Sequence, residues 1–122
     1  MLNTNSMEYL NKIELRGIVG SVRLIDMGGT KVAKLTIATN VAYRSSEGYP
    51  VIETTWHNVT AYEGRCNLPL EELHKGDKVY VTGRMRNQRY TTASGEDRTV
   101  AEVYAKEIEV YGNDEPIRFQ EL

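Results

Sequence analysis

Two aromatic side chains lie at positions where a strand would direct them away from an apolar core. Within residues 54–62, Trp56 and Tyr62 share even positions with threonine and asparagine, while odd positions include Val59 and Ala61. Side chains of a strand alternate between its two faces, so Trp56 and Tyr62 are expected on the more polar face. The alternative is that strand twist or a covering loop buries both rings.

Arginine and tyrosine alternate with apolar residues farther along the chain. Arg84, Arg86 and Tyr90 fall at even positions, whereas Val79 and Val81 fall at odd positions. As a strand, this stretch carries a basic strip that ends in an aromatic ring, on the face opposite the apolar residues. Taken alone, the strip is equally typical of a solvated outer strand, because exposed arginines are common.

Together, these residue types suit an unpaired nucleic acid strand. Every base has a π-face, and stacking on an aromatic ring contributes about 1–3 kcal/mol per base with little sequence preference. Arginine contacts phosphates and releases counterions, whereas a duplex hides the faces of its bases. The candidate phosphate contacts are Arg84, Arg86, Arg44 and Lys34.

The charge of the chain is compatible with this chemistry once its distribution is considered. The net charge is −2 at pH 7, which at first argues against a nucleic acid partner. Residues 1–112 hold equal numbers of acidic and basic side chains, so the excess lies in residues 113–122. Residues 82–92 contain three arginines and no acidic residue.

Composition excludes several other classes of protein. Cys66 is the only cysteine, which excludes an intrachain disulfide and a thiolate zinc cluster. No stretch approaches the 18 apolar residues of a membrane span. We therefore expect no metal, no cofactor and no membrane partner. The expected location is a bacterial-type cytoplasm.

The apolar pattern predicts five strands, with turns rich in glycine, serine and aspartate between them. The predicted strands are residues 12–25, 31–44, 52–62, 77–92 and 98–111. Gly17 and Gly20, together with a change in apolar phase, predict a bulged or sharply coiled first strand. Residues 64–75 predict a short helix, because Pro69 lies early in the stretch and Gly76 follows it.

This order of elements predicts the fold. An all-β chain with five strands and one short helix between the third and fourth is typical of the five-stranded OB-fold, a Greek-key barrel. A β-sandwich would need about seven strands and no such helix. The predicted organisation is an N-terminal extension at 1–10, the OB-fold domain at 11–111 and a short, acidic, flexible tail at 112–122.

Five stretches of sequence, in order and at suitable spacing, carry a family resemblance. They are residues 11–17, 35–39, 55–59, 73–83 and 94–98. On these stretches the chain resembles the bacterial single-stranded DNA-binding protein family over residues 10–111. The resemblance implies an OB-fold homotetramer that wraps single-stranded DNA around its outside, binding and protecting it with little sequence preference in replication, recombination and repair.

In that family four aromatic positions commonly stack on bases. The resemblance places them at Tyr43, Trp56, Tyr62 and Tyr90. Tyr43 shares its parity with Leu35 and Ile37, so the resemblance also implies that the second strand bends or ends near Val41. It further implies that His57 lies near a subunit contact, with a hydrogen-bonded core histidine as the alternative.

The tail differs from the pattern of the family, whose members typically end in an acidic tip that recruits other proteins. Residues 114–119 are a scrambled version of that tip, with Arg118 inside it and three further residues after Phe119. We therefore expect weakened recruitment, while DNA binding is unaffected.

Three other functions were weighed against DNA binding. Catalysis is not expected, because His57 and His74 are the only histidines and lie on different predicted elements. A primosomal or protein-interaction OB-fold module would not need aromatic rings beside arginines. Binding of single-stranded RNA is a closer rival, because stacking and phosphate contacts do not distinguish the two sugars.

Overall fold

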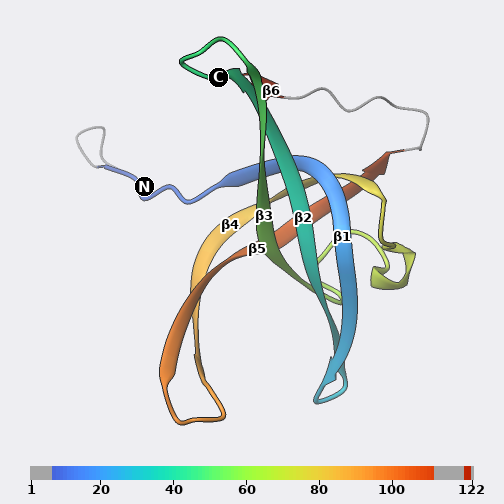
Figure 1. The fold of residues 1–122 in the computed structure, drawn as a ribbon. Helices are drawn as coiled ribbons and strands as arrows, with labels where there is room; N and C mark the ends of the chain where they lie inside the picture. Colours follow the sequence, from blue (N-terminus) through green and yellow to red (C-terminus); the bar gives the residue numbers. More distant parts are fainter. Residues whose placement is uncertain (1–6, 112–119, 122) are drawn as a thin grey trace.

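The computed structural model describes residues 7–111 and 120–121, and alternating apolar and polar residues form most of them into strands (Figure 1). The elements are β1 (Ile13–Met27), β2 (Thr30–Arg44), β3 (Pro50–Tyr62), the 3-10 turn η1 (Leu70–Glu72), β4 (Lys78–Thr91), β5 (Asp97–Tyr111) and β6 (Gln120–Glu121). None of the described residues forms a helix long and apolar enough to span a membrane.

β1 pairs with two different strands along its length. Its first part runs antiparallel to β4, with Ile13 opposite Gly83, and its second part runs antiparallel to β2, with Met27 opposite Thr30. The register shifts between Val19 and Ser21, at Gly20, which confirms the predicted bulge. A bulge bends a strand and increases its twist, and this allows β1 to pass from one partner to the other.

The barrel closes where β3 and β5 run side by side in parallel. The pairs at this closure are Val59 with Val103 and Thr60 with Tyr104. The strands follow one another around the barrel in the order β1, β2, β3, β5, β4 and back to β1. This all-β, five-stranded arrangement confirms the predicted OB-fold.

Buried side chains from all five strands fill the barrel, and two leucines from the η1 region join them. Leu70 and Leu73 are both buried in this core. The predicted helix is therefore confirmed in position, but it is a single 3-10 turn after Pro69, and Leu73 is already extended. Because side chains three residues apart in a 3-10 turn lie above one another, one turn suffices to bury both leucines.

β2 does not end near Val41, so the expected end of the strand there is wrong. β2 pairs with β3 without a register shift from Val32 opposite Tyr62 to Arg44 opposite Pro50. Residues directly opposite each other share a face of the sheet, so half-buried Tyr43 lies with Val51 on the face opposite to that of Trp56.

The C-terminal residues also differ from expectation. Instead of belonging to a free tail, Gln120–Glu121 pair in parallel with Val41 and Ala42 of β2. The scrambled tip falls within residues 112–119, which lie outside the described residues. Residues 1–6 of the expected N-terminal extension and residue 122 also lie outside them.

Candidate nucleic-acid interface

The barrel closure places a pair of aromatic rings on the outer face. Tyr62 ends β3, and Tyr104 of β5 pairs with Thr60 at the closure and with Arg84 of β4 on its other side. The Tyr62 and Tyr104 rings are stacked, with centroids 5.2 Å apart and planes inclined by 26°. Offset stacking of this kind is favourable beyond the area that it buries, so the rings support one another.

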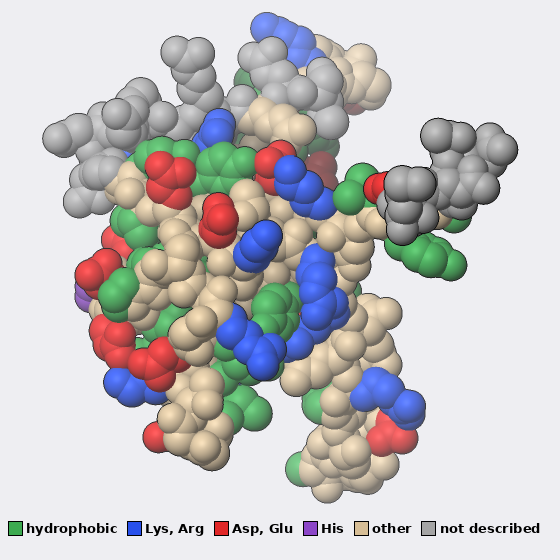
Figure 2. Space-filling view, turned by 180° about the vertical axis from the view of Figure 1, so that it is seen from behind, with side chains coloured by type: hydrophobic (Ala, Val, Ile, Leu, Met, Phe, Trp, Pro, Cys, Tyr) green, Lys and Arg blue, Asp and Glu red, His purple; other side chains and the backbone are tan. Residues whose placement is uncertain are grey.

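Two guanidinium groups cover this ring pair. The Arg84 guanidinium carbon lies 5.1 Å from the Tyr104 centroid, and that of Arg86 lies 4.6 Å from Tyr104 and 5.5 Å from Tyr62. At such distances a cation is attracted by the negative face of a ring. Seen from behind the view of Figure 1, Lys and Arg side chains surround a hydrophobic patch near the base of the β4–β5 hairpin (Figure 2).

A buried carboxylate lies beneath the cations. Glu102 is 5% exposed, and its Oε1 lies 2.6 Å from Arg86 Nε. The Thr60 hydroxyl donates to its Oε2 at 2.8 Å, and Lys34 Nζ lies 3.5 Å from the same oxygen. Arg86 also donates through Nη2 to the Tyr62 hydroxyl at 2.9 Å. Arg86 and Lys34, both expected to contact phosphate, are therefore already paired with this carboxylate.

The surroundings of Glu102 keep it ionised. Burial alone would raise its pKa, but hydrogen bonds from Thr60 and Arg86 and the charges of Lys34 and Arg86 outweigh burial and lower that pKa. With its amide nitrogen turned toward Glu102, Gln88 donates to both carboxylate oxygens, at 2.9 and 3.1 Å. The strip of residues 82–92 is therefore less basic in space than along the chain, because β5 supplies Glu102 beside Arg86.

A groove runs beside the cluster, between β1–β2–β3 and the β4–β5 hairpin. Buried Thr60 and Glu102 form part of its lining. Arg23, Lys34 and Tyr90 also line it, and the Tyr90 side chain is 47% exposed. The groove therefore combines positive charge with an accessible ring, which suits a phosphate-linked chain of bases.

Trp56 lies on the outer face with its indole against β1. It is 60% exposed, and a Cβ added to Gly20 would overlap its six-membered ring. One side of the indole is therefore supported by backbone. The prediction that Trp56, Tyr62 and Tyr90 lie outside the core is confirmed, and their role in base stacking stays a prediction.

The remaining predicted site residues lie apart from the cluster. Exposed Arg44 is at the end of the β2–β3 hairpin, where its Nη1 donates to the Gly48 carbonyl at 3.1 Å. Tyr43 is in the same hairpin. In Figure 1 this hairpin and the β4–β5 hairpin, which carries Tyr90, extend from opposite ends of the barrel.

Sequence reasoning missed two residues of the cluster, Glu102 and Tyr104. Their signal was the alternation of β5, where both have the parity opposite to buried Val103 and Ala105. The parity argument that identified Trp56 would have placed both of them on the outer face.

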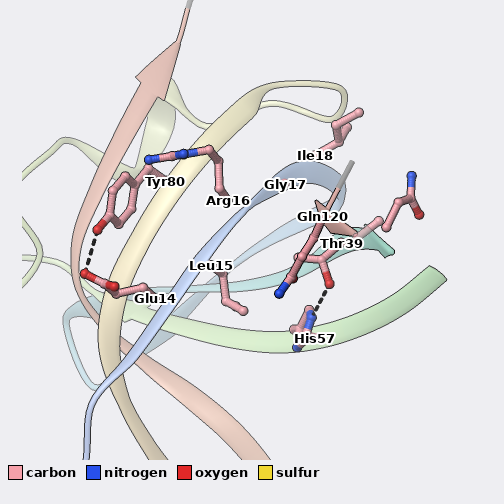
Figure 3. Close-up of a pocket in the computed structure, with 11 residues that line it drawn as sticks. Glu14, Leu15, Arg16, Gly17, Ile18, Thr39, His57, Tyr80 and Gln120 are labelled. Carbon is pink, nitrogen blue, oxygen red and sulfur yellow. Dashed lines mark hydrogen bonds between the residues drawn. The ribbon is translucent and has the colours of Figure 1, made fainter. Parts of the chain in front are cut away.

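His57 lies beside a separate hollow between β1 and β2 (Figure 3). The side chain is half-buried, and its Nε2 lies 2.8 Å from the Thr39 hydroxyl. Burial lowers the pKa of the imidazole. The opposite wall holds Tyr80, which donates to Glu14 at 2.7 Å and lies under the Arg16 guanidinium. Within residues 7–111 and 120–121, no cluster of His, Cys, Asp and Glu could hold a metal ion.

The barrel and its outer surface define the class of protein. A five-stranded barrel that carries stacked rings and cations over its closure is an OB-fold module of the kind that binds extended polymers. The chain belongs to the single-strand binding protein family, whose model matches residues 10–111.

Individual relatives agree with this family. The single-stranded DNA-binding protein of Neisseria meningitidis serogroup A is 32% identical over 106 residues, covering 84% of this chain and 60% of that protein. Single-stranded DNA-binding protein 1 of Xylella fastidiosa is 31% identical over 110 residues, covering 87% and 80%. The chain thus spans about three-fifths of the Neisseria relative.

A solved structure shares the fold. The Plasmodium falciparum SSB in complex with single-stranded DNA superposes with a TM-score of 0.73 and 25% sequence identity. The match covers 88% of this chain and 99% of that one.

Proposed function

We propose that this protein binds single-stranded DNA across its outer face, with little preference for sequence. The observation that carries the proposal is the stacked Tyr62–Tyr104 pair, covered by Arg84 and Arg86 at the barrel closure. Aromatic rings beside cations suit a chain of bases linked by phosphates, and exposed Arg84 supplies charge for a phosphate. The similarity to a Plasmodium structure solved with single-stranded DNA supports DNA as the ligand.

The other candidate residues extend this path. Trp56 and Tyr90 both present exposed rings, and Tyr90 and Lys34 line the groove. Tyr43 and Arg44 would contact a strand that continues along the β2–β3 hairpin. A DNA strand that reaches both the β2–β3 and the β4–β5 hairpin would cross the barrel closure.

We also propose a cellular role and an assembly. The protein protects single strands during replication, recombination and repair in a bacterial-type cytoplasm, without catalysing a reaction. It acts as a homotetramer, with His57 near a subunit contact and weak recruitment through the tail. The family resemblance supports these proposals, and light scattering of the purified protein tests the tetramer.

Trp56 provides the test of DNA binding, because it is the only tryptophan of the chain. We expect oligo-dT to quench its emission strongly and a duplex of equal length to leave it unchanged. Increasing salt should weaken the binding, as phosphate contacts require. Fluorescence anisotropy of labelled oligo-dT provides a second readout, and its failure to detect binding would overturn the proposed function.

Single-stranded RNA is the matched alternative ligand. Oligo-rU of the same length has the same charge and can stack, but carries 2′-hydroxyl groups. Tighter binding of oligo-rU than of oligo-dT would replace DNA with RNA as the proposed ligand.

A further inference from the structure

Glu102 brings a negative charge to a face that would bind a polyanion. A buried carboxylate on such a face opposes phosphate, unless its partners neutralise it. Lys34 and Arg86 do so, with their nitrogens 3.5 and 2.6 Å from the carboxylate oxygens. Two cations on the face thus compensate one acid, and any benefit of Glu102 must come from what it holds in place.

Glu102 holds Arg86 in a fixed orientation. Arg86 Nε is bound to Glu102, and its Nη2 donates to the Tyr62 hydroxyl at 2.9 Å. Its guanidinium plane is also held over the Tyr104 ring, 4.6 Å from the centroid. The planar fork of arginine allows these three contacts at once, which a lysine ammonium on a flexible stem cannot reproduce.

The same contacts fix the ring that a base would meet. Tyr62 is held at its hydroxyl by Arg86 and at its ring by Tyr104, whose centroid is 5.2 Å away. Holding a ring in place before the ligand arrives lowers the entropy that is lost on binding. Arg84 differs from Arg86, because Arg84 is exposed and forms no ion pair with a carboxylate among the described residues.

We propose that Glu102 and Arg86 form a positioning pair that holds the Tyr62–Tyr104 rings ready for base stacking, while Arg84 makes the phosphate contact. This inference rests on the proposed function. It replaces the role in phosphate binding that the sequence predicts for Arg86, and it assigns a role to a carboxylate that charge alone would disfavour.

The pair of substitutions Arg86→Lys and Arg84→Lys tests the difference between the two arginines. Both keep the charge and lose the planar fork. Arg84→Lys should lower the oligo-dT affinity less than Arg86→Lys does, because lysine also binds phosphate. Arg86→Lys should lower the affinity about tenfold, the size of one lost stacking interaction. Equal affinities of the two variants would overturn the proposal.

Glu102→Gln gives a second test, because a positioning role and a purely electrostatic role predict opposite changes in the affinity for oligo-dT. If Glu102 only weakened the positive potential, its neutralisation would tighten binding of oligo-dT and steepen the dependence on salt. A positioning role instead predicts binding about tenfold weaker, despite the lost negative charge. Glu107→Gln, which neutralises an exposed carboxylate of the same strand, is the matched control and should not weaken binding.

Affinity must be compared between folded proteins. Circular dichroism at the binding temperature shows whether each variant is folded. If Glu102→Gln is unfolded, the comparison of Arg86→Lys with Arg84→Lys decides the proposal. Failure of the unaltered protein to bind oligo-dT overturns the proposed function itself. Binding by the unaltered protein together with tighter binding by folded Glu102→Gln overturns only the positioning role.

Discussion

The indole of Trp56 lies against the backbone of Gly20, and only a residue without a side chain leaves room for it there. The Cβ of any other residue at position 20 would overlap the six-membered ring. Gly20 is also the site of the register shift in the pairing of β1 with β2. One glycine thus serves both the bulge of β1 and the close packing of an exposed ring.

Gly20→Ala should displace the Trp56 ring. We expect a changed emission spectrum in the free protein and weaker quenching by oligo-dT, because the ring loses its support. Gly28→Ala is the matched control, since it strains the β1–β2 turn at a φ of +64° while its Cβ meets no atom within 4 Å. It should lower the melting temperature without changing Trp56 emission, and an unchanged spectrum in folded Gly20→Ala would contradict the seating of the ring.

Tyr90→Ala should weaken oligo-dT binding by about 1–3 kcal/mol, the contribution of one base stacked on an aromatic ring. Tyr90 is exposed and lines the groove, so its removal leaves no cavity in the core. Tyr9→Ala removes an exposed tyrosine from the segment before β1 and should change affinity little. A titration monitored by anisotropy compares the two, and equal losses would argue against a specific role of Tyr90.

Arg84→Ala should make binding less sensitive to salt. Each lost phosphate contact on a single strand lowers the slope of log K against log [salt] by about 0.7. Arg16→Ala is the control, because Arg16 lies over Tyr80 beside the separate hollow of Figure 3. Titrations at four or more salt concentrations give both slopes, and an unchanged slope for Arg84→Ala would remove its phosphate contact from the proposal.

The pKa of Glu102 predicts a component of acid stability. Hydrogen bonds from Thr60 and Arg86 and nearby positive charges outweigh the effect of burial and hold this pKa below its ordinary value of 4.5. The ionised form is favoured in the folded state, so the contribution is complete above pH 4.5 and is lost as the pH falls through the lower folded pKa.

Urea unfolding at several pH values measures this component. Glu102→Gln should lower the urea concentration at the unfolding midpoint at pH 7, relative to the unaltered protein. Below pH 4.5, the midpoint of this variant should fall less steeply with decreasing pH. Glu107→Gln controls for the loss of one carboxylate. Parallel pH profiles for the unaltered protein and Glu102→Gln would show that Glu102 contributes nothing to acid stability.

Alternation in the sequence was sufficient to assign faces on β3 and β4. Both strands keep a regular period of two around their outward residues, so sequence parity alone separates Trp56, Tyr62 and Tyr90 from the core. The change of apolar phase at Gly20 likewise predicted the bulge, because inserting one residue must shift the side chains that follow.

The ion pair between Arg86 and Glu102 could not be predicted in the same way. It depends on the register of β4 against β5, which shifts between Thr82 and Gly83. A shift of one residue would have placed a different side chain opposite Arg86. Sequence parity gives the face of each residue, whereas only the pairing gives its neighbour across the strands.

Two expectations failed, one drawn from local helix signals and the other from the family resemblance. The helix start and stop signals within residues 64–76 marked the right place, but burial of Leu70 and Leu73 required only one 3-10 turn. The role implied for Tyr43 suggested a bend, yet pairing with β3 keeps β2 regular as far as Arg44.

The closure of the barrel has a mechanical consequence. β3 and β5 meet through two residue pairs, whereas β2 and β3 pair along most of their lengths. The short closure is where the barrel can part with the fewest broken hydrogen bonds, and Tyr62, Tyr104 and Thr60 lie on it. A DNA strand stacked across these residues would hold β3 and β5 together. Binding of DNA to this surface would therefore make the barrel harder to open.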